Sequence, residues 1–119
     1  MKHFKLKEFE CKCGCGLNNF SDVLATILDD MRELCGFPFI IKSGCRCIPH
    51  NKKEGGKKRS DHLTGEGVDI KATTNYERFL IISYAIFAGI TRIGLARSFI
   101  HLGIREGNPK KRLWIYFGG

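Results

Sequence analysis

Apolar side chains recur every three or four residues between Ser21 and Gly36, which predicts an amphipathic helix. Ser21 can cap the start of this helix and Gly36 can end it. After Pro38, the short apolar run Phe39-Ile40-Ile41 predicts a strand. The apolar positions of the helix are Val23, Leu24, Ile27, Leu28, Met31 and Leu34.

A second helix is predicted from about Tyr76 to Ala88, with Asn75 as its cap and Gly89 at its end. The apolar run from Phe79 to Ile90 predicts that this helix is buried, and the run is shorter than the roughly 20 residues that span a bilayer. Alternating or apolar runs predict strands at Gly67–Ala72, Thr91–Leu95, Phe99–Leu102 and Arg112–Phe117.

The segment from Gly44 to Gly67 lacks apolar periodicity and is rich in Gly, Lys and Asn, so it is interpreted as a long, functional loop. At 119 residues, with 43% hydrophobic residues, the chain is long enough for one domain, residues 1–119, with its own core. The order of elements predicts an α+β fold with two principal helices and a mainly antiparallel sheet.

Candidate metal ligands lie in the long loop and in two of the predicted strands. His62 precedes Asp69 in Ser60-Asp61-His62-Leu63-Thr64-Gly65-Glu66-Gly67-Val68-Asp69, and a further histidine, His101, lies within a predicted strand. Asp and His side chains on half-buried strands are costly unless they are hydrogen-bonded or bind a metal. Two imidazoles and one carboxylate form a three-ligand zinc set with an open fourth position, which is typical of catalytic zinc and hydrolysis.

The motifs around these residues resemble the M15 family of zinc D-Ala-D-Ala carboxypeptidases and endolysin peptidases. The resemblance extends from about Leu6 to Trp114. It rests on Phe9-Glu10-Cys11-Lys12-Cys13-Gly14-Cys15-Gly16, Ser43-Gly44-Cys45-Arg46-Cys47, His50-Asn51, Gly55-Gly56, Ser60-Asp61-His62-Leu63-Thr64-Gly65, Val68-Asp69 and Phe99-Ile100-His101.

The resemblance implies that His62, Asp69 and His101 bind one catalytic Zn²⁺, and that Arg46 and Ser60 position the substrate peptide. A guanidinium fork suits a carboxylate held through two hydrogen bonds. The implied fold is hedgehog/DD-peptidase-like, and the implied reaction is hydrolysis of peptidoglycan stem or cross-link peptides, as a carboxypeptidase or an endopeptidase.

The general base of such a hydrolase is not evident. Small members of the family usually place an Asp two residues after the last zinc histidine, and other branches place an acidic residue or His three residues before it. This chain has Gly103 and Ser98 there. Glu106 is one candidate base, with Glu66, Asp61 and His50 as others. The alternative function is a non-catalytic, zinc-containing module that binds cell wall or protein and has lost its base.

Six cysteines leave several states open. Cys11, Cys13, Cys15, Cys45 and Cys47 can be buried or free thiols, disulfides formed after release, or ligands of a structural zinc. Cys35 is expected in the core.

The net charge of +8 favours a polyanionic partner such as the bacterial cell wall. Nucleic acid is not favoured, because no aromatic interleaving accompanies the basic residues. The alternation of charge and apolar residues over Met1–Phe9 lacks the core of a signal peptide. The resemblance further implies a phage or prophage origin. We expect a monomer that is made in the cytoplasm and acts at the bacterial cell wall. The loop cations are Lys52, Lys53, Lys57, Lys58 and Arg59.

Overall fold

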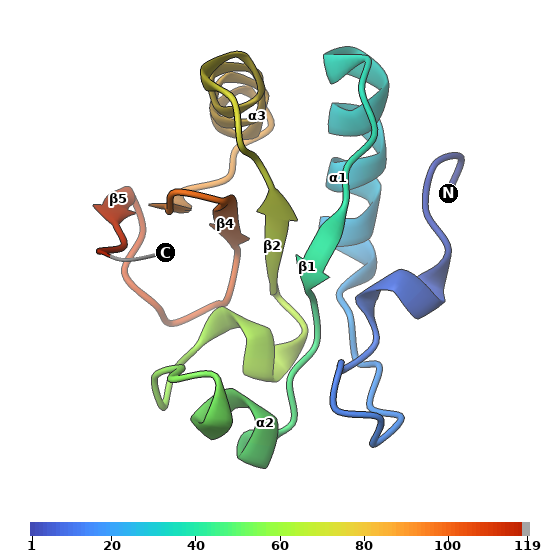
Figure 1. Cartoon of the computed structure of the whole chain (residues 1–119), viewed down its shortest axis with the longest axis vertical. Coiled ribbons are helices and arrows are strands. Elements are labelled where there is room, and N and C mark those ends of the chain that lie inside the picture. The colour runs from blue at the N-terminus through green and yellow to red at the C-terminus, as the bar shows by residue number, and fades with distance from the viewer. Residues whose placement is uncertain (118–119) are drawn as a thin grey trace.

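The computed structural model describes residues 1–117, which form an α+β domain around a five-stranded sheet (Figure 1). Neighbouring strands are antiparallel except β3 and β5, which pair in parallel. The predicted fold class is therefore confirmed. The spatial order is β1 (Ile41–Ser43), β2 (Gly67–Lys71), β4 (Phe99–Gly103), β3 (Arg92–Leu95) and β5 (Arg112–Ile115).

Helix α1 (Asp22–Cys35) begins and ends where the sequence predicts. The Ser21 hydroxyl oxygen accepts a hydrogen bond from the Leu24 amide at 3.2 Å, and Gly36 takes the left-handed conformation at φ 78°. Its buried face is narrower than predicted, because Val23 and Leu34 are exposed. The buried residues are Leu24, Ala25, Leu28, Met31 and Cys35.

Helix α3 (Asn75–Phe87) corrects two predictions. Its cap is Thr74 rather than Asn75, because Thr74 forms a capping box in which its hydroxyl accepts from the Glu77 amide at 3.1 Å. The helix is also not fully buried: Phe79 is 70% exposed, and Ile86 and Phe87 also face solvent. Ile81 and Ala85 form its buried stripe.

The segment between β1 and β2 is more ordered than the predicted loop. It contains the short helix α2 (Ile48–Lys53) and the 3₁₀ turn η2 (Asp61–Thr64). Both lie together at the lower end of the sheet in Figure 1, while α3 lies at the upper end. Strand β1 also begins at Ile41 instead of at Phe39, although Phe39 is buried in the core.

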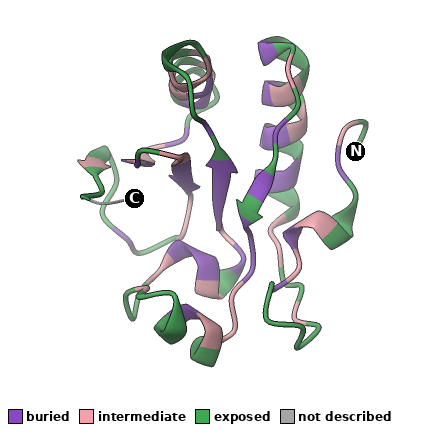
Figure 2. Cartoon of the chain, in the orientation of Figure 1, coloured by how far each residue is buried: buried purple, intermediate pink, exposed green. Residues whose placement is uncertain are grey.

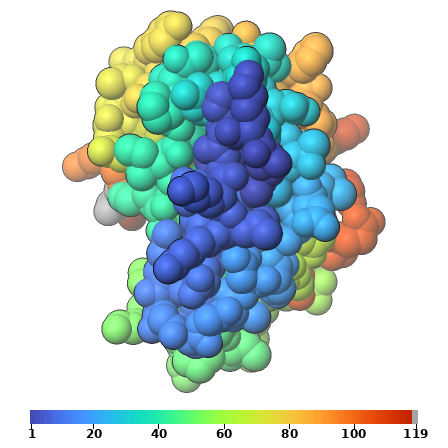
Figure 3. Space-filling model, turned by 90° about the vertical axis from the view of Figure 1, so that its right-hand side faces the viewer, coloured from blue at the N-terminus to red at the C-terminus, as the bar shows by residue number. Residues whose placement is uncertain are grey.

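The N-terminal arm, which includes the 3₁₀ turn η1 (Leu6–Phe9), packs across α1 and adds aromatic side chains to the core (Figure 3). The Phe9 ring stacks on Phe20 with centroids 4.0 Å apart, and Phe4 contacts both Phe9 and Phe39. Figure 2 shows that burial continues through the central strands to η2.

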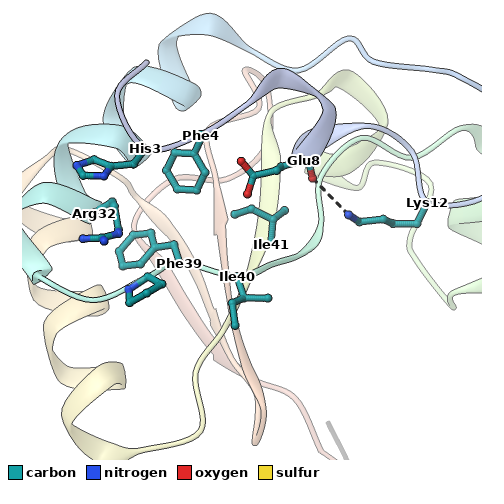
Figure 4. A pocket seen from close by; sticks show the side chains of 9 residues that line it. His3, Phe4, Glu8, Lys12, Arg32, Phe39, Ile40 and Ile41 are labelled. Atoms are coloured by element: carbon teal, nitrogen blue, oxygen red, sulfur yellow. Dashed lines mark hydrogen bonds between the residues drawn. The ribbon is translucent and has the colours of Figure 1, made fainter.

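A cavity of about 410 Å³ lies between this arm, α1 and the residues that lead into β1 (Figure 4). Its lining includes Phe4, Arg32 and Phe39 and none of the candidate zinc ligands. Among the described residues, no helix combines the length and the hydropathy that crossing a membrane requires.

Candidate metal centre

The sheet register brings two candidate ligands side by side. Asp69 of β2 lies directly opposite His101 of β4. His62 reaches them from η2, which Ser60 caps through the His62 amide at 3.2 Å and which ends at Gly65 in the left-handed conformation, φ 71°. A turn that ends just before β2 therefore returns an imidazole to that strand.

These three side chains, called the ligand triad below, are buried, and one donor atom from each lies within 4.8 Å of the others. The Asp69 Oδ1 atom is 3.2 Å from His62 Nε2 and 2.9 Å from His101 Nδ1. The imidazole rings meet edge-on with centroids 4.9 Å apart. Residues from three separate elements thus converge as the sequence predicts.

Hydrogen bonds at the far side of each imidazole determine which nitrogen can bind a metal. His62 Nδ1 lies 2.7 Å from the Gly44 carbonyl oxygen, which can only accept, so Nδ1 carries the proton. Nε2, which lies 3.2 Å from Asp69 Oδ1, is then the nitrogen that a metal would take. His101 Nε2 lies 2.9 Å from Asp61 Oδ2, which leaves Nδ1 to face Asp69.

Asp61 thus stands behind His101, outside the ligand triad. It is buried and receives hydrogen bonds from the Arg92 guanidinium at 3.1 Å, from the Arg105 amide and from the Asn108 side chain. A carboxylate that fixes the tautomer and orientation of a ligating histidine is a common outer partner in zinc sites. In this position Asp61 acts as a positioning residue for His101.

The pKa shifts of Asp69 and His101 are those expected of a site that attracts a cation. Burial opposes ionisation of Asp69, but hydrogen bonds from His101 and His62 outweigh it and hold the pKa of Asp69 well below its ordinary value. Burial likewise opposes charge on His101, yet Asp61 and Asp69 together raise the pKa of His101. The two carboxylates thus place negative charge on both sides of one imidazole.

The M15 peptidase family model matches residues 2–103, which include the whole ligand triad. The chain belongs to the M15 peptidase family. No curated relative matches it at a significant level. The family supports a peptidase with a peptide substrate, and the ligand triad provides its candidate metal-binding residues.

In this M15 peptidase, Arg46 lies beside the ligand triad and is largely buried. Its guanidinium donates to Asp69 Oδ2 at 3.2 Å, to Ser43 Oγ at 2.9 Å and to Asn51 Oδ1 at 3.3 Å. These bonds hold the guanidinium in place and engage the Asp69 oxygen that does not contact the histidines. Arg46 therefore orients a candidate ligand, in addition to the substrate role that the sequence suggests.

Ser60 and Glu106, the other two candidate site residues, lie in different surroundings. Ser60 caps η2, and its carbonyl oxygen accepts from Arg105 at 3.0 Å, so the residue helps to set the position of His62. Glu106 lies on the surface with its side chain 89% exposed, where its carboxylate pairs with Lys110 at 3.5 Å. Glu106 is not part of the ligand triad.

Gly103, where small M15 peptidases usually have an Asp, faces Asp61. A Cβ atom at Gly103 would overlap the Asp61 carboxylate oxygen. The space that a side chain at position 103 would occupy is therefore filled by a carboxylate from η2. This carboxylate is bonded to the far nitrogen of His101, so it does not take the place of the expected general base.

Two aromatic residues that sequence reasoning missed border the site. Trp114 of β5 lies 5.6 Å from the His101 ring, and Tyr116 lies 6.2 Å from Trp114. Gly94 lies between His101 and Trp114 in the sheet. It makes room for the rings of Trp114 and Tyr116, because a Cβ at Gly94 would lie 2.6 Å from an atom of each ring. Burial raises the pKa of Tyr116, and the negative charge of Asp69 raises it further. Only knowledge of the parallel β3–β5 pairing would have shown that these aromatic residues lie beside His101.

Proposed function

We propose that the protein is a zinc-dependent peptidase that hydrolyses stem or cross-link peptides of peptidoglycan. The observation that carries the proposal is the convergence of His62 Nε2, Asp69 Oδ1 and His101 Nδ1, within the M15 family. A carboxypeptidase and an endopeptidase both fit this site. The cationic surface supports an anionic polymer as the location of the substrate.

The donor set fits zinc. Two neutral imidazoles and one carboxylate are ligands that Zn²⁺ accepts, and three protein ligands leave a position open. Without a metal, both nitrogens of His101 face oxygens that can only accept, so the ring must carry two protons. A cation at Nδ1 removes that requirement. When bound, zinc would lower the pKa of a water molecule and polarise the scissile carbonyl.

The residues of the chain would hold and orient the reacting groups. The Gly44 carbonyl and Asp61 fix the two imidazoles, and Arg46 fixes Asp69. A guanidinium has five N–H groups, and the three bonds of Arg46 use three of them. The remaining N–H groups are suited to a substrate carbonyl or terminal carboxylate. The Ser60 hydroxyl oxygen accepts in its cap and still has a proton to donate to the peptide.

Proton transfer is proposed for Glu106, one of the candidate bases from the sequence. Its exposed carboxylate pairs with Lys110, so the turn after β4 would have to bring it over the ligand triad. If Glu106 is the base, Glu106→Gln should lower the turnover by about 10²–10⁴-fold and leave zinc content unchanged. An unchanged rate would exclude Glu106.

The second candidate function is a module that binds wall peptide without cleaving it. It is favoured by the residues at the two positions where the family places a proton-transfer group, Gly103 and Ser98, neither of which has a carboxylate. The same ligand triad and Arg46 would then hold zinc and peptide as a recognition site. The two functions differ in whether a peptide bond is broken.

The test combines metal content with cleavage of purified peptidoglycan. The parent protein should release new amino groups, and chelation should stop the release. His62→Ala should lose most of its affinity for zinc at the ligand triad and its activity, because only two protein ligands remain. His3→Ala, a histidine on the N-terminal arm, should change neither. Bound wall peptide without cleavage, in zinc-loaded protein, would establish the binding module instead.

A further inference from the structure

A second group of potential metal ligands lies away from the ligand triad. The Sγ atoms of Cys11, Cys13, Cys15 and Cys47 all lie within 4.8 Å of one another. These four residues, called the thiol cluster below, come from two segments: the loop after η1 and the start of α2. Cys47 is 36 residues beyond Cys11 in the chain, so the fold and not local sequence brings them together.

Three of the four sulfur atoms are spaced as they would be in a tetrahedral metal site. Cys11 Sγ lies 3.4 Å from Cys13 Sγ and 3.8 Å from Cys47 Sγ, and Cys13 and Cys47 are 3.6 Å apart. Four sulfurs at about 2.3 Å from one zinc ion are separated by about 3.8 Å. A disulfide would need about 2.05 Å. Each of the six cysteines is a free thiol.

Glycine turns in the loop backbone bring the three thiols of this loop close together. Gly14 and Gly16 adopt left-handed conformations, at φ 87° and 86°, which allow the chain to turn after Cys13 and again after Cys15. The Cys11 amide donates to the Leu17 carbonyl at 2.9 Å and closes the loop. The Cys47 amide donates to Cys11 Sγ at 3.4 Å, an interaction that stabilises negative charge on the sulfur.

The other two cysteines, Cys45 and Cys35, lie outside the thiol cluster. Cys45 Sγ is 3.6 Å from Asn18 Oδ1 and lies outside the thiol cluster, although the sequence groups it with Cys47. Cys35 is buried in the core at the end of α1, as predicted. The fold therefore selects four cysteines from six, and four is the number of ligands of a closed structural zinc site.

We propose that the thiol cluster binds a structural zinc ion, separate from the ion of the ligand triad. Four thiolates around Zn²⁺ carry a net charge of about −2. A cavity of about 400 Å³ beside Cys13 and Cys47 is lined by Lys12, Lys53 and His50 as well. The two lysines are placed to offset that charge.

The proposed site would connect the N-terminal arm to the peptide-binding side of the ligand triad. Cys47 directly follows Arg46, and the Cys45 amide donates to the Phe9 carbonyl at 2.8 Å. Figure 3 shows the arm and the loop after it along one face, with the loop next to the α2 region. Zinc at the thiol cluster would thus hold together the segment that carries both Arg46 and the Gly44 carbonyl.

The experiment uses the full chain loaded with zinc under reducing conditions. The parent protein should contain two zinc ions per chain. Cys13→Ser and Cys47→Ser should each lose one ion, whereas Cys35→Ser, which alters a thiol outside the cluster, should retain both. His62→Ala should also lose one ion but keep the cluster's ion, so failure of either site is distinguishable from failure of the other.

Cobalt gives a readout that does not depend on the folding of a cysteine variant. Co²⁺ added to metal-free His62→Ala should produce the thiolate-to-metal charge-transfer absorption of a tetrahedral sulfur site, and added zinc should remove it. One zinc per chain in the parent, with no such absorption, would overturn the proposal. An intact mass that shows disulfides among these four cysteines in freshly purified reduced protein would overturn it as well.

Discussion

At the residue scale, the least expected finding is the role of Asp61. The sequence offers it only as one of several acidic neighbours of His62, because the spacing of η2 does not show which way its side chain points. The structure directs it away from the ligand triad's open side and against the far nitrogen of His101. His62, Asp69 and His101 could be predicted because their residue types and strand context restrict the chemistry. Asp61 could not, because its role depends on the packing of η2 against β4.

This position predicts that Asp61→Asn weakens zinc binding at the ligand triad by about 10–100-fold. The amide can still accept a hydrogen bond from His101, but the negative charge that makes the imidazole a better ligand is lost. The zinc affinity of the ligand triad is measured by competition with a chelator, and zinc bound at any tighter site is measured separately. Asp30→Asn, an exposed carboxylate on α1, serves as the matched control. Equal affinity in the parent and Asp61→Asn would show that Asp61 serves stability alone.

At the element scale, the long helices were easier to predict than the short elements. Helix α1 has a continuous 3.6-residue period and both of its capping residues, so pattern and chemistry agree. Helix α2 has only six residues, includes Pro49 and has no apolar period, and its buried Asn51 is held by the Lys57 carbonyl. Tertiary contacts stabilise such an element, so its sequence resembles a loop. Strand β1 is displaced for a similar reason, since Phe39 is buried by aromatic packing instead of strand pairing.

The corrected cap of α3 yields a stability prediction. Thr74→Ala should lower the free energy of unfolding by about 1 kcal/mol, because the Glu77 amide loses its hydrogen-bond acceptor. Thr73→Ala, the adjacent threonine outside the helix, should have a smaller effect. Urea unfolding of zinc-loaded protein measures both, and zinc content should not change in either. A larger loss for Thr73→Ala would mean that the cap has been misassigned.

At the scale of the whole molecule, the sheet supplies two ligands of the proposed catalytic zinc, and the segment between β1 and β2 supplies the third. That segment also carries Arg46, Cys47 and a set of exposed lysines. The two proposed zinc ions would therefore hold the segment at both of its ends. The fold class was predictable from element order, whereas this arrangement was not, because it joins side chains distant in sequence.

The exposed lysines of the same segment predict how the protein would associate with the wall. Replacing Lys52, Lys57 and Lys58 with Gln lowers the formal net charge from +8 to +5. Binding to purified sacculi should weaken and lose most of its dependence on salt, because exposed cations act through screened electrostatics. Arg59 is left unchanged, since its guanidinium donates to Asn108 at 3.3 Å and its carbonyl accepts from the same residue. Zinc content should remain that of the parent.

The control removes charge elsewhere: Lys5→Gln with Lys7→Gln, on the N-terminal arm, is compared with Lys57→Gln with Lys58→Gln, each pair losing two charges. If the segment beside the ligand triad faces the polymer, only the second pair should reduce sacculus binding substantially. Equal losses would mean that net charge, without a preferred face, governs association. Tighter binding to duplex DNA than to sacculi, with a steep salt dependence, would instead assign the basic surface to nucleic acid.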